Sequence, residues 1–168
     1  MSQDDLIKRI VNHVGVVVFP PVPQQSIEDA ERELGFPLPP FLSELYRRVG
    51  NGGFGPRGGL LGLNDSGMLE EGYYSLVSSY HLWQDREVQN PTPFPWPEHV
   101  LQLTDANNRL WSALDCTKTP SPVLCLDQFE YDFNITRFED GLKLEAPSLE
   151  AWFEAWLDGK IREDNWKQ

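Results

Sequence analysis

The chain has 168 residues, with 14 basic side chains against 26 acidic ones and a sequence pI of about 4.6. Its formal net charge of −12 disfavours direct binding to nucleic acid, because a phosphate backbone would be repelled; the same charge would attract a basic partner. An apolar content of 40% argues against intrinsic disorder, and the length is typical of one domain, which we expect to span residues 1–168.

The sequence also restricts the compartment and the chemistry. The longest apolar run, residues 14–19, is too short for a membrane span, and the acidic N-terminus differs from a basic signal peptide. We therefore expect a cytoplasmic protein. Cys116 and Cys125 are too few for a disulfide framework or a four-ligand metal site, so we expect reduced thiols. We also expect no metal and no cofactor.

The N-terminal part of the chain has the periodicity of helices. Apolar residues at helical spacing predict a first helix over residues 4–14. Ser26 is a suitable N-cap for a second helix, since Asp29 follows three residues later as in a capping box. Gly35 would end this second helix.

Two more helices are expected before the chain changes character. One begins after two prolines and covers residues 41–49, and the next covers residues 73–83. Between them lies a glycine-rich stretch over residues 50–62, and residues 60–63 could form a short strand. Four prolines within residues 90–97 exclude regular structure there.

From residue 100 onward the apolar period falls to two, which indicates strands. Residues 100–104 and 110–114 read as a hairpin, followed by further strands at 123–126 and around 133–135. Ser148 then caps a last helix, whose apolar stripe we expect in the core. The chain thus has helices first, then a group of strands and one closing helix. This order predicts an α+β fold with a largely antiparallel sheet.

No motif predicts catalysis. Residues 53–58 match the letters of the dinucleotide-binding fingerprint, but they follow a helix where the motif must follow a strand. The three histidines, His13, His81 and His99, lack the spacing of a helical zinc site. With no nucleophile–base constellation visible, a small enzyme is the least favoured hypothesis.

Acidic residues are concentrated near the C-terminal end. Residues 127–164 contain eleven acids and four bases, a local charge of −7. Each acid taken alone is most simply a solvated side chain, but together they can form a patch for a basic partner. Aromatic residues outside the helical stripes, including Phe54 and Trp96, are further contact candidates. The partner-binding candidates are Glu70, Glu71, Asp127, Glu130, Asp132, Glu139, Asp140, Phe129 and Tyr131.

The order of motifs resembles the SUKH superfamily, the Smi/Knr-like proteins. The resemblance begins with residues 26–35, 38–46 and 50–53 and continues through Trp96-Pro97 to the tryptophan-bearing last helix, so its core spans residues 26–159. The signature residues end one helix, start another and turn the chain, and we expect them to be structural. They are Leu34, Gly35, Leu38, Pro39, Asn51 and Gly52.

The resemblance implies a mixed sheet flanked by helices and a function without catalysis. Bacterial members are mostly immunity proteins that bind and neutralise a cognate toxin domain, whereas fungal relatives regulate cell-wall synthesis as interaction hubs. We therefore expect a stoichiometric inhibitor of a basic toxin domain, with nucleases as one candidate class. The alternative is a regulatory scaffold with no toxin partner. The choice between monomer and dimer stays open.

Overall fold

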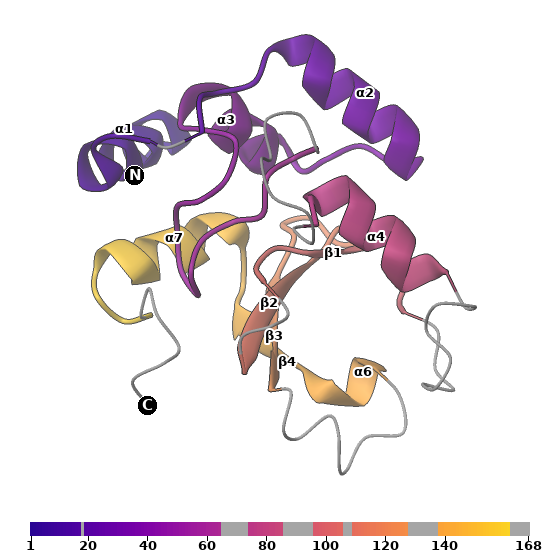
Figure 1. The fold of residues 1–168 in the computed structure, drawn as a ribbon. Coiled ribbons are helices and arrows are strands. Elements are labelled where there is room, and N and C mark those ends of the chain that lie inside the picture. Colours follow the sequence, from indigo (N-terminus) through magenta and orange to yellow (C-terminus); the bar gives the residue numbers. More distant parts are fainter. Residues whose placement is uncertain (18, 65–73, 86–95, 106–108, 128–137, 162–168) are drawn as a thin grey trace.

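The computed structural model describes residues 1–17, 19–64, 74–85, 96–105, 109–127 and 138–161. Most of the described helices precede the sheet, a short one lies between its last two strands and one follows it, so the predicted α+β fold is confirmed (Figure 1). The helices and strands in chain order are α1 (Gln3–Val14), α2 (Gln24–Leu34), α3 (Pro40–Arg48), α4 (Leu76–Gln84), β1 (Val100–Gln102), β2 (Leu110–Asp115), β3 (Val123–Asp127), α6 (Phe138–Gly141), β4 (Leu142–Ala146) and α7 (Leu149–Leu157).

The four described strands form one sheet in the order β1-β2-β3-β4, and every neighbouring pair is antiparallel. Trp111 of β2 lies opposite Leu126 of β3, and Ser112 lies opposite Cys125. A register shift between Val123 and Leu124 interrupts the pairing of β3 with β4. Because paired residues project to the same face, Trp111 and Ser112 mark the two faces of the sheet.

Each face of the sheet is covered by a different group of elements. On the Trp111 face, Trp83 of α4 and Trp96 stack on Trp111, with ring centroids 4.9–5.7 Å apart. On the Ser112 face, the Ser112 hydroxyl and the indole N–H of Trp152 in α7 both donate to Glu145. The tryptophan-rich last helix is therefore part of the core, as its apolar stripe predicted.

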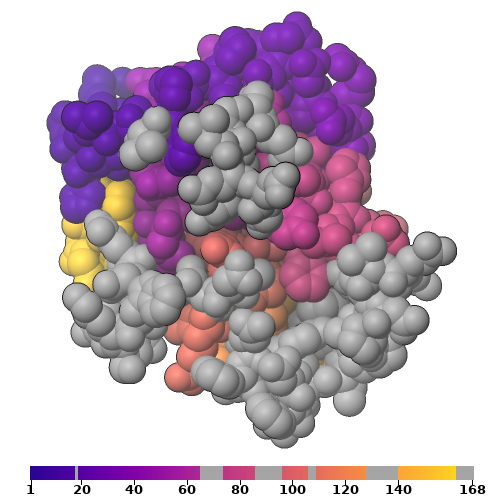
Figure 2. Space-filling model, viewed as in Figure 1, coloured from indigo at the N-terminus to yellow at the C-terminus, as the bar shows by residue number. Residues whose placement is uncertain are grey.

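The N-terminal helix lies against the C-terminal one, and Figure 2 shows α1 in contact with α7 at one side of the molecule. Helix α1 buries Leu6, Ile7 and Ile10. The seam between α1 and α7 includes Gln3 Nε2, which donates to Glu150 Oε1 over 2.7 Å, and the ring of His13, which packs edge-on against Trp156 at 4.7 Å. Elements from both ends of the described chain thus form one interface.

Some local predictions were wrong. Helix α2 begins at Gln24 after Pro23, and it has no side-chain cap. Ser26 therefore lies inside the first turn, while Asp29 accepts hydrogen bonds from the side chains of Gln25 and Arg32 instead of closing a capping box. Pro23 lies just before the helix in the extended conformation that is usual for the residue preceding a helix, with φ of −72° and ψ of 161°.

The strand expected over residues 60–63 does not form. Leu61 N–H donates one hydrogen bond to the carbonyl of Leu103, the residue after β1, without a continuous ladder. Phe54 and Trp96 are also not surface contacts, because both are buried in the core. The strand expected around residues 133–135 lies outside the described residues. None of the described helices is long and apolar enough to span a membrane.

Candidate partner-binding surface

The acidic stretch is the partner-binding surface that the sequence predicts, and the structure describes part of it. Asp127 ends β3, where its carboxylate lies 3.1 Å from the guanidinium of Arg109. Glu139 and Asp140 belong to α6, and Asp140 is exposed. The remaining candidates lie outside the described residues: Glu70, Glu71, Phe129, Glu130, Tyr131 and Asp132.

The signature residues of the α2–α3 connection shape the chain. Leu34 is the last residue of α2 and is buried, and Gly35 follows it in the left-handed conformation with φ of 83°. Leu38 is buried, and its backbone N–H donates to Glu31 Oε1 over 2.9 Å. Pro39 precedes the first residue of α3. Together these residues end α2 and start α3 within a short connection.

The second signature pair fixes the glycine-rich loop. The side chain of Asn51 is buried, and its Oδ1 accepts a hydrogen bond from the backbone N–H of Leu63 over 2.7 Å. Gly52 has φ of 84°, and a Cβ atom there would lie 2.7 Å from the backbone of both Leu60 and Gly62. Only glycine can occupy such a position without moving the neighbouring backbone.

Leu38 and Pro39 also line a groove that sequence reasoning missed. The groove has a volume of about 340 Å³ and lies between the α2–α3 connection, the β2–β3 turn and the start of α7. Its lining includes Lys118 and Glu150, so it contains one cation and one anion among largely apolar side chains and prolines. Segments distant in the sequence form it, and no local motif could have indicated it.

A buried carboxylate, that of Glu145, ties the glycine-rich loop to the sheet. Arg57 donates to Glu145 Oε1 through Nη2 over 2.6 Å and through Nε over 3.1 Å. Ser112 Oγ and Trp152 Nε1 donate to Glu145 Oε2 over 2.8 and 2.9 Å. The side chains of Arg57 and Glu145 are only 13% and 9% exposed. Both carboxylate oxygens are occupied, so this group braces the fold and has no oxygen left for acid–base chemistry.

The thiols are also unsuited to nucleophilic chemistry. Burial, with a smaller effect from the Asp115 carboxylate, raises the pKa of Cys116 to about 12. Burial raises the pKa of Cys125 to about 11, and Glu145 adds to this. Both side chains are thus neutral thiols near pH 7, and only the thiolate is a strong nucleophile. Within the described ranges, no cluster of three or more histidine, cysteine or acidic residues could hold a metal ion.

Comparison with known families identifies the architecture. The model of the SMI1 / KNR4 family (SUKH-1) matches residues 21–155, most of the chain. The chain belongs to this family. The predicted resemblance to SUKH proteins is therefore confirmed, and the match includes every signature residue from Leu34 to Gly52. Helix α1 ends at Val14, before the matched region begins at residue 21. The curated proteins contain no match to the chain.

Membership in the SMI1 / KNR4 family supports a general role in protein binding, because SUKH proteins are generally non-enzymatic immunity or regulatory proteins. The geometry above is compatible with that role. Buried polar side chains such as Glu145 hold the loops in place, and charged and apolar side chains remain exposed at the surface.

Proposed function

We propose that this SMI1 / KNR4 family protein is an immunity protein that acts in the cytoplasm. It binds a cognate bacterial toxin domain with one-to-one stoichiometry and blocks the toxin's active site or substrate groove. The observation that carries the proposal is membership in this family combined with a net charge of −12. A toxin domain that must hold nucleic acid would itself be basic, and an acidic inhibitor would complement it.

We assign the toxin-facing side to the acidic stretch that includes Asp127 and Asp140. Residues 127–164 carry a net charge of −7 out of the −12 of the whole chain, and Asp127, Glu139 and Asp140 are the acids of this stretch that lie at β3 and α6. The groove at Leu38 is a weaker candidate for a basic partner, since its Lys118 and Glu150 balance each other in charge. Charge complementarity therefore favours the end of the molecule that carries β3 and α6.

The proposed mechanism predicts fast association that depends on salt. Attraction between an acidic inhibitor and a basic toxin raises the association rate, and mobile ions screen it over about 8–10 Å at physiological ionic strength. Dissociation depends instead on the desolvated contacts at the centre of the interface. Association should slow markedly as salt rises, whereas a rate that is flat from low to high salt would refute the electrostatic part of the mechanism.

The first experiment is a pull-down from the source cell's lysate and culture with the full chain as bait at low salt. Capture of a basic toxin domain in stoichiometric amount, followed by growth rescue on co-expression, is the expected result. Capture of housekeeping proteins alone, with no toxin gene nearby, would contradict the proposal and favour the regulatory scaffold.

Matched charge variants then test the assigned surface. The double variant Asp127→Asn/Asp140→Asn removes two charges near α6, and Glu28→Gln/Glu33→Gln removes two exposed charges on α2. Figure 1 places α2 and α6 at opposite ends of the molecule. We expect the first variant to slow association about threefold to tenfold at low salt, and the second to have a much smaller effect. Equal effects of the two variants would contradict the surface assignment while leaving the net-charge argument intact.

A further inference from the structure

The glycine-rich loop after α3 contains an arm, residues 53–60, whose tip reaches the sheet. The arm is held as a hairpin, because Gly53 N–H donates to the Leu60 carbonyl and Leu60 N–H donates to the Phe54 carbonyl, both over 2.9 Å. Figure 1 shows the loop extending past α7 toward the sheet. Arg57 lies at the tip of the arm, so the arm brings one guanidinium to the sheet.

The carboxylate that Arg57 meets, that of Glu145 in β4, has the geometry of a guanidinium site. Its Oε1 atom accepts both hydrogen bonds from Arg57, from Nη2 over 2.6 Å and from Nε over 3.1 Å. Its Oε2 atom accepts from the Ser112 hydroxyl and the Trp152 indole, so elements other than the arm orient it. Two N–H groups from one planar cation fit this arrangement, whereas an ammonium is a single point charge.

The backbone at the tip of the arm favours release of Arg57. This residue has φ of 58°, in the left-handed region that a residue with a side chain adopts at a cost. Gly58 and Gly59 follow with φ of 83° and 101°, and glycine has more backbone freedom to regain than any other residue. Gly58 is also exposed, so the tip lies at the surface. Backbone strain at a residue that fills a buried polar site indicates a functional role for that residue.

The Glu145 site lies beside the surface that we assigned to the partner. Cys125 of β3 is opposite Ser112 on one neighbouring strand and opposite Lys143 on the other. Both Glu145 and Asp127 are near enough to the Cys125 thiol to raise its pKa. The two carboxylates are therefore neighbours around one residue of β3, and a partner held at Asp127 would lie next to the Glu145 site.

We propose that Glu145, Ser112 and Trp152 form an arginine-binding site, which Arg57 fills in the free protein and yields to an arginine of the partner. The exchange conserves the chemistry, because the incoming guanidinium makes the same hydrogen bonds and the same ion pair that Arg57 gives up. The remaining cost is the movement of the arm, which relief of strain at Arg57 reduces. This inference rests on the proposed function, since it specifies how a basic toxin domain binds.

Two peptides of equal charge test the exchange in the ¹⁵N-labelled full chain. They are Arg-Leu-Arg-Leu-Arg and Lys-Leu-Lys-Leu-Lys, both with blocked ends. We expect the arginine peptide to shift the indole N–H resonance of Trp152 in a saturable way and to speed hydrogen exchange at the Leu60 amide about tenfold, because the arm opens. The lysine peptide should do neither. Equal responses to the two peptides, or no response to the arginine peptide, would overturn the proposal.

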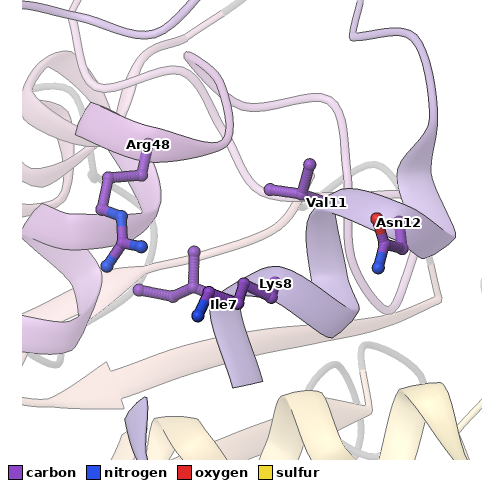
Figure 3. A pocket seen from close by; sticks show the side chains of 5 residues that line it. All are labelled: Ile7, Lys8, Val11, Asn12 and Arg48. Carbon is purple, nitrogen blue, oxygen red and sulfur yellow. The ribbon is translucent and has the colours of Figure 1, made fainter. Parts of the chain in front are cut away.

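Removal of Arg57 tests the ligand chemistry separately. We expect methylguanidinium to raise the melting temperature of Arg57→Ala and to bind it about tenfold more tightly than methylammonium does. Arg48→Ala is the control, because Arg48 pairs with Asp4 over 2.7 Å at the hollow between α1 and α3 (Figure 3), and these two side chains are 38% and 53% exposed. No preference between the two cations in Arg57→Ala, or an equal gain in Arg48→Ala, would contradict the proposal.

The outcomes for the arginine site and for the proposed function can be told apart. Selective binding of the arginine peptide without capture of a toxin would support the site and contradict the immunity role. Capture of a basic toxin without selectivity for arginine would support the immunity role and contradict the site. The peptide titration uses the wild-type protein, so it decides the proposal even where Arg57→Ala does not fold.

Discussion

Replacement of Glu145 should cost far more stability than replacement of an exposed acid. In Glu145→Leu, the guanidinium of Arg57 would lose the Glu145 carboxylate while it stays nearly buried, since that side chain is 13% exposed. Removing one partner of a buried ion pair costs about 3–5 kcal/mol. The indole N–H of Trp152 would lose its acceptor as well. Against a typical total of about 5–15 kcal/mol, this loss brings the protein close to unfolding.

Glu145→Gln removes the negative charge of the side chain but keeps its shape. Its amide oxygen can still accept from Arg57, but its amide nitrogen would face the indole N–H of Trp152, donor against donor. A buried donor without a partner costs about 1–3 kcal/mol, so this variant should lie between Glu145→Leu and the wild type. Ser112 is a smaller concern, because a hydroxyl can turn and accept instead.

Equilibrium unfolding in urea measures these differences. Asp127→Asn is the control, because it breaks an ion pair with Arg109, whose side chain is 53% exposed, and such a pair is worth about 0–1 kcal/mol. The double variant Arg57→Met/Glu145→Leu should recover part of the stability, since it removes both charges together. If Glu145→Leu cost no more than Asp127→Asn, the argument from the buried ion pair would be wrong.

Other positions give predictions of the same kind. Gly52→Ala should lower the free energy of unfolding by about 4 kcal/mol or more, because the new Cβ would lie 2.7 Å from backbone atoms. Gly35→Ala should lower it by only about 1–2 kcal/mol, because no atom lies within 4 Å of the new Cβ and only the left-handed backbone is strained. Denaturation midpoints that do not rank the two variants in this order would contradict the packing argument. Asn51→Ala should lower the free energy of unfolding by about 1–3 kcal/mol in the same assay, because the amide of Leu63 loses its acceptor. A loss below about 0.5 kcal/mol, the size expected for a surface substitution, would refute this prediction. The raised pKa values of Cys116 and Cys125, about 12 and 11, mean that the unfolded chain releases both thiol protons first. Stability should therefore fall from about pH 9 toward pH 12, and less steeply in the double serine variant; equal slopes in melting temperature would contradict this.

Local patterns were sufficient for the helices that carry a clear apolar stripe. The stripes of α1, α3 and α7 appear in the sequence at helical spacing, and Ser148 caps α7 as expected, accepting from the N–H of Ala151. Strand β4 shows the limit of such patterns. Its alternation of Leu142 and Leu144 with charged residues suggests that Glu145 faces solvent, but Arg57, 88 residues away, holds it in the interior. Tertiary contacts decide burial at such positions.

The candidate surfaces also differ in how far the sequence could predict them. The acidic stretch follows from composition, and its role in partner binding stays a prediction for Asp127 and Asp140 as for the rest. The groove at Leu38 and the hollow between Lys8 and Arg48 could not be predicted, because their walls come from segments that meet only in the folded chain. Lys8 and Arg48 illustrate this, since 40 positions separate them and Asp4 joins them.

The seam between α1 and α7 also determines when the protein can finish folding. Gln3 must find Glu150, which emerges 147 residues later during synthesis. At about 5–20 residues per second, the ribosome needs about 7–30 s to make the chain between them. During this interval the apolar stripe of α1 lacks the helix that covers much of it, although α3 is already present. We therefore expect a chain that ends before α7 to be more prone to aggregation than the full chain, because part of the apolar stripe of α1 then stays exposed.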